Sequence, residues 1–334
     1  MSKTSKTNVA IVGCGRIAAA HLQALQNIDE VRLVGVADLD ALARDSFSSK
    51  ANCAAYSDYR EMIDTEIPEV VVVCVPPISH PEVATYALEH GTNVLCEKPF
   101  SIDTRSAIRM VSVAERNNRY LTMASKFRFV EDVAKARELV RDGLIGKMVL
   151  CEIAFCARAD MRGRWPSDPA ISGGGVLIDN GSHAVDIIRY LLGPISRVQA
   201  QHGRNVQGLN VEDTTMVFVE TVDGVWGRID LSWSIEKNHD AFICMHGSDG
   251  MLVIGWNASR YRRYDTKEWT QFGSGYNKLA AFVQQHRNFI DCVHGEADPV
   301  INAEDSLESV RVIEVAYRSA RENKWSEVEE CLAR

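Results

Sequence analysis

The sequence predicts an α/β fold in two parts, a doubly wound parallel sheet followed by an α+β domain with a large, mostly antiparallel sheet. In the first third of the chain, short apolar runs alternate with helical segments, which is the pattern of a parallel sheet covered by helices. Further along, strands follow one another with short turns between them. A chain of 334 residues has room for two domains. The change of pattern places them at residues 1–125 and 126–334.

The strands expected in the first domain are apolar throughout, as residues 70–75 (VVVVCV) illustrate. Strands that are buried on both faces belong to parallel sheets with helices on each side. The segments between them carry apolar residues at helical spacing. In chain order, we expect strands at 8–12, 31–37, 70–75, 93–96 and 120–124, helices at 17–27, 81–90 and 101–118, and a short helical stretch at 59–63.

The second domain combines helices with a run of strands. Asp-Gly pairs at 223–224 and 249–250 are typical of tight turns between antiparallel strands. In chain order, we expect a helix at 130–141, a long strand at 148–157, a polar loop, a helix that begins at the glycines 173–175, strands within 197–269, and closing helices at 277–293 and 303–323.

Composition and charge narrow the class of partner. Hydrophobic residues make up 46% and charged residues 25% of the chain, as in a folded globular protein rather than a disordered one. Lysine and arginine number 37 against 45 aspartates and glutamates, a net charge of −8. This acidic balance disfavours nucleic acid and anionic membranes, and no apolar run reaches the roughly 20 residues of a membrane span. We therefore expect a small-molecule partner.

Nine cysteines are spread singly through the chain, with no Cys-x-x-Cys pair, and most lie in apolar runs. Most are interpreted as small buried hydrophobic residues. Their odd number, and the absence of a secretory signal in the first residues, favour a reducing, cytoplasmic location.

A glycine motif, GCGRIA at 13–18, lies between the first expected strand and the first expected helix. Glycines there permit a tight turn and let backbone amides approach a pyrophosphate at the positive end of the helix. The motif therefore predicts a dinucleotide-binding Rossmann domain, with Gly13, Gly15, Arg16 and Ile17 at the cofactor. Ala18 replaces the third glycine of the usual motif. The alternative is that these small residues only let a helix pack closely on a strand.

Asp38 ends the second expected strand, where dinucleotide-binding folds place an acidic residue. Its two oxygens can accept hydrogen bonds from the adenosine ribose hydroxyls, and they would repel a 2′-phosphate. No arginine follows before Arg44. NAD(H) is therefore favoured over NADP(H), while a simple turn role for Asp38 remains the alternative.

Three further segments occur in order, VPPISH at 75–80, CEKPF at 96–100 and GGGVLIDNGSHAVD at 173–186. With them, nearly the whole chain resembles the Gfo/Idh/MocA family (glucose-fructose oxidoreductase, inositol dehydrogenase and rhizopine catabolism). The resemblance implies a nicotinamide-dependent sugar or cyclitol dehydrogenase that forms a homo-oligomer, a dimer or tetramer, through its C-terminal sheet. The residues that the resemblance places at the cofactor include Pro76, His80, Glu97 and Lys98, and those that it places in catalysis are Lys98, Asp179 and His183.

The position of Lys98 also has a physical reading. It follows the expected strand at 93–96, so its ammonium is expected at the carboxyl end of the sheet, where doubly wound folds bind ligands. A cation there lowers the pKa of a bound alcohol. Pro99 restrains the chain after Lys98, and the bond between them has access to the cis form. The alternative for Glu97 and Lys98 is a solvated surface ion pair.

Asp179 and His183 are four residues apart, so a helix places them on one face. An aspartate next to an imidazole orients the ring and stabilises its protonated form, which suits alcohol oxidation. The alternative is a core histidine satisfied by a carboxylate. With Asp186 the segment still offers too few ligands for a metal, and no metal site is expected.

Three other residues are candidates for contact with the substrate, beside Lys98, Asp179 and His183. Arg128 matches a position where relatives carry an arginine near the substrate, and an interdomain salt bridge is its alternative. Arg158 and Trp165 lie in the loop after the strand at 148–157, where they can offer hydrogen-bond donors and a flat apolar face to a sugar ring. The alternative for these two is an ordinary surface loop.

The predicted function is an NAD-dependent oxidoreductase that acts on a secondary hydroxyl, or the matching ketone, of a sugar, amino sugar or cyclitol. His183 would be the acid/base and Asp179 its orienting partner, while Lys98 polarises the oxygen or itself carries the proton. Relatives suggest two alternatives: an NAD-using glycosidase of the same fold, and a non-catalytic NAD-binding sensor or co-regulator. A sensor has no need of these three residues together.

Overall fold

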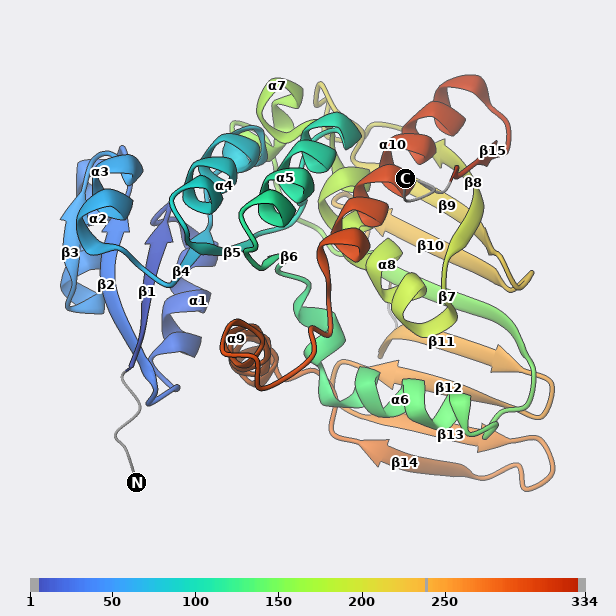
Figure 1. Ribbon diagram of the computed structural model, residues 1–334. Helices are drawn as coiled ribbons and strands as arrows, with labels where there is room; N and C mark the ends of the chain where they lie inside the picture. Colours follow the sequence, from blue (N-terminus) through green and yellow to red (C-terminus); the bar gives the residue numbers. More distant parts are fainter. Residues whose placement is uncertain (1–5, 238–239, 330–334) are drawn as a thin grey trace, which may run out of the picture. The chain divides into compact units, whose positions relative to one another are not determined.

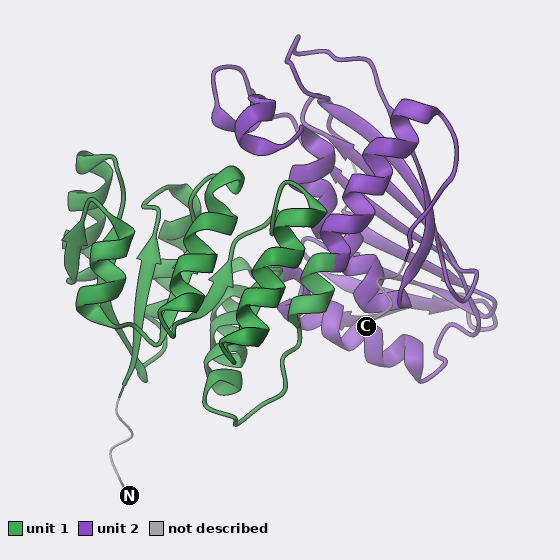
Figure 2. Ribbon diagram, turned by 45° about the horizontal axis from the view of Figure 1, so that its top comes forward, with its two compact units in different colours: residues 1–126, 278–307 green, residues 127–277, 308–334 purple. Residues whose placement is uncertain are grey.

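A computed structural model of the protein describes residues 6–237 and 240–329. Contacts divide the chain into two units (Figure 2). Of the described residues, the first unit contains 6–126 and 278–307, and the second contains 127–237, 240–277 and 308–329. Across these described ranges, no helix combines the length and the apolar character needed to cross a membrane.

The first unit contains a six-stranded sheet in which all neighbours are parallel (Figure 1). Its strands are β1 (Thr7–Val12), β2 (Val31–Ala37), β3 (Ala54–Tyr56), β4 (Val70–Val73), β5 (Asn93–Cys96) and β6 (Leu121–Met123). They are ordered β3-β2-β1-β4-β5-β6. The direction of winding therefore reverses between β1 and β4, and this confirms the predicted doubly wound sheet.

The helices of the first unit connect these strands, with one exception from the C-terminal third of the chain. They are α1 (Arg16–Leu25), α2 (Ala41–Ala51), α3 (Tyr59–Glu66), the 3-10 helix η1 (Pro77–Ser79), α4 (His80–Glu89), α5 (Thr104–Arg116) and, from the later part, α9 (Lys278–Val293). Helix α9 packs against α1. Its Phe289 and Ile290 belong to the apolar core that residues of β1, β2 and β4 also form.

Two elements of this unit are not apparent from the sequence pattern, helix α2 and strand β3. Phe47 is the buried residue of α2, so the helix lacks the apolar stripe by which helices are recognised. The Asp40 side chain begins it by accepting hydrogen bonds from the amides of Leu42 and Ala43. Strand β3 has three residues at the edge of the sheet and is too short to show an alternating pattern.

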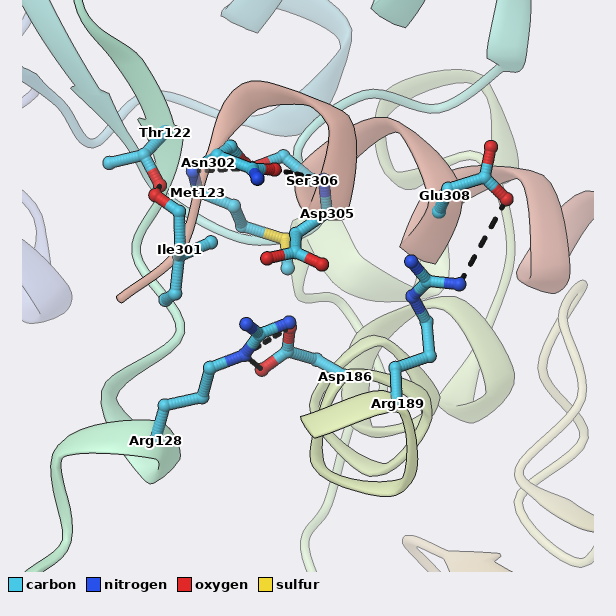
Figure 3. A network of polar contacts seen from close by, with 10 residues as sticks. All are labelled: Thr122, Met123, Arg128, Asp186, Arg189, Ile301, Asn302, Asp305, Ser306 and Glu308. Atoms are coloured by element: carbon cyan, nitrogen blue, oxygen red, sulfur yellow. Dashed lines mark hydrogen bonds and ion pairs between the residues drawn. The ribbon is translucent and has the colours of Figure 1, made fainter. Parts of the chain in front are cut away.

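The segment after α9 is tied to β6 within the first unit (Figure 3). The Thr122 hydroxyl donates to the Ile301 carbonyl (2.8 Å), and the Met123 amide donates to the Ser306 hydroxyl (3.0 Å). Residues 278–307 thus pack with the first unit, although residues 127–277 of the second unit precede them in the sequence. The division into a cofactor domain at 1–125 and a substrate domain at 126–334 stays a prediction, because packing alone does not show what each part binds.

The second unit contains a nine-stranded sheet of order β14-β13-β12-β11-β7-β10-β9-β8-β15. Neighbours are antiparallel except β7 and β10, which run parallel. This confirms the mostly antiparallel sheet, with tight connections at both Asp-Gly pairs. The strands are β7 (Met148–Cys156), β8 (Ile195–His202), β9 (Thr214–Thr221), β10 (Trp226–Ser232), β11 (Ala241–Gly247), β12 (Gly250–Gly255), β13 (Ser259–Arg263), β14 (Trp269–Gly273) and β15 (Ser326–Glu327).

Helix α8 (Val176–Leu192) packs against β7, β9 and β10 of this sheet. It begins directly after the three glycines, as predicted. Two helices, η2 and α10, have their first residues in the first unit and the rest in the second. The remaining helices of this part are η2 (Lys126–Phe129), α6 (Glu131–Arg141), η3 (Trp165–Ser167), α7 (Pro169–Ser172) and α10 (Ala303–Glu322).

Candidate active site

The glycine motif forms the turn from β1 into α1. The surroundings of its two glycines differ. Gly13 has a φ of +94°, and a Cβ there would lie 2.7 Å from the backbone of Cys74, just after β4. A Cβ at Gly15 would meet no atom within 4 Å. The fold therefore requires Gly13, whereas the space beside Gly15, at the N-terminus of α1, suits a pyrophosphate. Arg16 is exposed and Ile17 half-buried in the first turn of that helix.

We expect alanine substitutions at the two glycines to separate these roles. Gly13→Ala forces a side chain into a strained conformation against backbone, so the free energy of unfolding should fall by about 2 kcal/mol or more. Gly15→Ala should change it by less than about 1 kcal/mol and weaken NAD binding. Urea unfolding and a fluorescence titration with NAD measure the two effects. Equal losses of stability in both variants would contradict this assignment.

Asp38, directly after β2, is held beside the glycine turn. Its Oδ2 accepts a hydrogen bond from the Cys14 amide (2.6 Å), and its Oδ1 accepts one from the Asp40 amide (2.9 Å). Burial, and then the charge of Asp38, raise the pKa of the Cys14 thiol to about 12, so the thiol is neutral. The turn role that the sequence left open is present. Contact of Asp38 with the ribose stays a prediction.

The segment 97–99 follows β5, at the carboxyl edge of the parallel sheet where the glycine turn and Asp38 also lie. The Lys98–Pro99 peptide bond is cis. Glu97 is only 6% exposed, and its Oε2 accepts a hydrogen bond from the Lys98 amide (3.0 Å). Lys98 itself is half-buried. Because Glu97 faces the interior of its unit, the alternative of a solvated ion pair does not describe it.

Two histidines that the sequence did not single out lie behind Glu97. Oε1 of Glu97 is 2.9 Å from Nε2 of His21 on α1, and Nδ1 of His21 is 2.8 Å from Nε2 of His286 on α9. Burial alone would raise the pKa of Glu97, but the hydrogen bond and charge of His21, with the charges of Lys126 and Lys98, lower it below its ordinary value. Burial and His21 lower the pKa of His286 well below its ordinary value. Glu97 is therefore a carboxylate and His286 a neutral imidazole.

His80, the first residue of α4, joins two of the predicted segments. Its Nε2 is 2.9 Å from the carbonyl oxygen of Val75, and its Nδ1 is 2.9 Å from that of Pro99. Burial lowers the pKa of His80 below its ordinary value, against the opposing effect of these carbonyls. Pro76 is half-buried in the same loop. A neutral His80 ring has one N–H group, so it donates to one of these two carbonyl oxygens and thereby links the two segments. Contact of His80 or Pro76 with the cofactor stays a prediction.

We expect the free energy of unfolding to decrease as the pH falls below about 6.5, the ordinary pKa of histidine. His80 and His286 have lowered pKa values when folded, so below that pH the unfolded chain binds more protons than the folded one. Each group then contributes up to about 1.4 kcal/mol per pH unit. Urea unfolding at pH about 5.5 and about 7.5 measures this dependence. His286→Gln should weaken it, and an unchanged dependence would argue against a neutral buried His286.

Asp179 and His183 lie one turn apart on α8, as their spacing predicts. Asp179 is half-buried in the first turn, where the helix dipole favours a negative charge. His183 is 7% exposed, and its ring meets the Phe127 ring edge-on with centroids 5.0 Å apart. The local fold thus holds the ring of His183 firmly. The catalytic roles of the two residues stay predictions.

Arg128 forms a buried ion pair with Asp186 of α8 (Figure 3). Its Nε and Nη2 lie 3.0 and 2.7 Å from Oδ1 of Asp186, and its guanidinium carbon lies 5.2 Å from the centre of the Tyr190 ring. Both partners belong to the second unit, so the salt bridge is not one between units. Contact of Arg128 with a substrate stays a prediction.

Arg158 and Trp165 are both exposed in the loop after β7, with Trp165 at 47%. Gln207 anchors this loop. Its side-chain amide donates to the Ala159 carbonyl (2.9 Å), and its Oε1 accepts a hydrogen bond from the Met161 amide (2.9 Å). An anchored loop with exposed donor and aromatic groups is compatible with substrate binding, which stays a prediction for both residues.

Glu212, which the sequence also did not single out, caps α8. Its Oε1 accepts hydrogen bonds from the amides of Gly175 and Leu177 (both 3.0 Å) and from the Tyr317 hydroxyl (2.8 Å). A Cβ at Gly175 would lie 2.0 Å from the Glu212 carbonyl oxygen. The glycine at 175 therefore reflects this close approach. Glu212 lies 37 positions from Gly175, so no local motif connects the two.

The candidate residues divide between the units. Those expected at the cofactor, from Gly13 to Lys98, all belong to the first unit. Within it, Gly13 and Cys14 lie next to Asp38. His80 contacts the segment that contains Glu97 and Lys98. Asp179, His183 and the further substrate candidates belong to the second. That the side chains of Lys98 and His183 converge on one nicotinamide stays a prediction.

Comparison with known proteins supports the predicted family for both parts of the chain. Residues 7–125 match a family model, GFO_IDH_MocA, described as an oxidoreductase family with an NAD-binding Rossmann fold, and residues 133–253 match the GFO/IDH/MocA C-terminal domain. The D-apiose dehydrogenase of Paraburkholderia graminis is 25% identical over 96% of this chain and 89% of its own length. The myo-inositol 2-dehydrogenase of Thermotoga maritima is 25% identical over 97% of this chain and 99% of its own length.

Among solved structures, a levoglucosan dehydrogenase in complex with NADH aligns with a TM-score of 0.90 at 18% identity, over 98% of this chain and all of its own. This likeness supports the fold. The residues of the first unit also fit a dinucleotide, because the space beside Gly15 is open and Asp38 is held next to the turn. The two family models span more than two thirds of the sequence, and the chain therefore belongs to the GFO/IDH/MocA family of NAD-binding oxidoreductases.

Proposed function

We propose that the protein is a dehydrogenase that moves a hydride between NAD and a secondary hydroxyl, or the matching ketone, of a sugar, amino sugar or cyclitol. The observation that carries the proposal is the half-buried Lys98 at the carboxyl end of β5, in a unit whose glycine turn suits a dinucleotide. Relatives named as D-apiose and myo-inositol dehydrogenases support this substrate class.

The chain's own residues supply the remaining chemistry. NAD, when bound, accepts the hydride. In one arrangement, the Lys98 ammonium lowers the pKa of the reacting hydroxyl, and His183 takes the proton with Asp179 as its orienting partner. In the other, Lys98 as a neutral amine takes the proton itself. Arg128, Arg158 and Trp165 are the proposed further contacts of the substrate, and Pro76, His80 and Glu97 those of the cofactor.

We also propose a homo-oligomer, a dimer or tetramer, in the cytoplasm. The family resemblance supports the oligomer. Eight described cysteines are thiols without a disulfide, and burial raises the pKa of all eight, including Cys151 and Cys244. Such thiols suit a reducing compartment.

A single assay tests the function. The purified full-length chain is incubated with NAD and a panel of sugars, cyclitols and glycosides, while NADH and product sugars are followed. NADH formed in proportion to product supports the dehydrogenase. Glycoside cleavage without net NADH would instead support an NAD-using glycosidase, and tight NAD binding with no turnover of any panel member would support a sensor.

A further inference from the structure

A line of buried polar side chains runs through the first unit to the peptide of Lys98. His286 contacts His21 (2.8 Å), His21 contacts Glu97 (2.9 Å), and Glu97 accepts a hydrogen bond from the Lys98 amide (3.0 Å). All three side chains are buried. Burying polar groups is unfavourable, and apolar residues of similar shape would often stabilise a core equally well. Packing alone therefore does not explain these residues.

The hydrogen bonds in this line are consistent with a negative Glu97. Since the carboxylate accepts, Nε2 of His21 donates to it. His286 is neutral, so the contact between Nδ1 of His21 and Nε2 of His286 contains one proton. If His21 is neutral, Nε2 of His286 donates to Nδ1 of His21. If His21 is charged, Nδ1 of His21 donates to Nε2 of His286. In either form, His21 keeps its hydrogen bond to Glu97, and His286 restrains the His21 ring.

The surroundings add positive charge near Glu97. Its pKa is lowered by His21, Lys126 and Lys98. The Phe282 ring of α9 packs edge-on against His21 at 4.9 Å, and Lys126 and Lys278 lie 5.6 and 5.9 Å from the centre of that ring. The neighbouring Cys74 and Cys96 thiols are neutral, because burial and then the charge of Glu97 raise their pKa values well above the ordinary range.

We infer that Glu97 and His21 are positioning residues for Lys98: His21 fixes the Glu97 carboxylate, and the carboxylate holds the peptide of Lys98. His286 supports this role by restraining His21. The inference rests on the proposed role of Lys98 in catalysis.

Four variants separate positioning from packing. Glu97→Gln keeps the shape and removes the charge. His21→Phe removes the donor to Glu97, whereas His21→Gln retains an N–H group near the position of Nε2. The matched control is Gln285→Leu, since Gln285 is a buried neighbour of His286, 2% exposed, and its amide has no hydrogen-bond partner within the part of the chain that the structure describes.

The first measurement does not depend on turnover. Each variant is labelled with acetic anhydride at pH values from about 6 to about 10, and mass spectrometry gives the rate at Lys98 relative to the exposed Lys50. Glu97→Gln should raise this ratio by about 3- to 10-fold, because a Lys98 segment that the carboxylate no longer holds opens more often to the reagent. His21→Phe should raise it mainly at low pH, where Glu97 without its donor becomes protonated. His21→Gln and Gln285→Leu should resemble the wild type.

The second measurement is steady-state kinetics. Glu97→Gln and His21→Phe should lower kcat by about 10- to 100-fold with the Kd for NAD within about threefold, and His21→Gln should recover most of kcat. If His21→Phe does not fold, Glu97→Gln and His21→Gln still decide the outcome. Wild-type labelling of Lys98 in Glu97→Gln, or equal effects in Gln285→Leu, would overturn the inference. A wild-type protein without dehydrogenase activity would refute the proposed function alone, because the labelling experiment needs no substrate.

Discussion

Lys98→Met is expected to lower kcat by about 10³-fold while the Kd for NAD stays within about threefold. Methionine has a similar length and no charge, so the cation that would stabilise a developing alkoxide is lost and the shape is kept. Lys98 is half-buried, which strengthens its electrostatic effect relative to a solvated lysine. Stopped-flow measurement of NADH formation, with a separate NAD titration, distinguishes loss of chemistry from loss of binding.

The matched control is Lys50→Met. Lys50 is an exposed lysine near the end of α2 in the same unit, and its replacement should leave kcat within about twofold. Near-normal turnover in Lys98→Met would remove Lys98 from the proposed mechanism. An equal loss of NAD affinity would instead assign Lys98 to cofactor binding.

Asp186→Ala is expected to lower the free energy of unfolding by about 3–5 kcal/mol. Asp186 and Arg128 are both buried and joined by several hydrogen bonds. Removing the carboxylate leaves the guanidinium charge in the interior without this partner, and burying such a charge is strongly unfavourable. Urea unfolding measures the loss.

Two further variants test whether the charge is the cause. The double variant Arg128→Met with Asp186→Leu removes both charges and should recover much of the lost stability. Asp160→Ala breaks the ion pair with Arg162, in which both residues are exposed, and should cost less than about 1 kcal/mol. If Asp186→Ala were no more destabilising than Asp160→Ala, the buried pair would not stabilise the second unit.

The sequence alone predicted those features that depend on neighbouring residues. Apolar runs such as 70–75 identified buried parallel strands, because a strand between two helical layers is apolar on both faces. The glycine turn and Asp38 were likewise identified, because a turn and the strand end beside it need particular residue types at short spacing. Helix α2 and strand β3 escaped notice, since neither carries a regular apolar pattern.

Within the candidate site, the sequence identified the segments with a local motif. It did not identify the residues from distant segments that hold these motifs in place. Glu97 and Lys98 stand out in the sequence, but the contact of His21 with His286 joins residues 265 positions apart. The Glu212 cap on α8 similarly joins residues 37 positions apart. A periodic pattern contains no signal for such pairs.

What the sequence by itself determined is therefore the order of those elements that carry a regular apolar pattern, the glycine turn and the identity of the reactive candidates. The tertiary structure alone decided that Glu97 is a buried carboxylate bound by His21, that Asp186 neutralises Arg128, and that α9 completes the first unit. The physical reason is the distance along the sequence over which each effect acts. Strand, helix and turn preferences act over a few residues, whereas burial and ion pairing arise only when distant segments pack together.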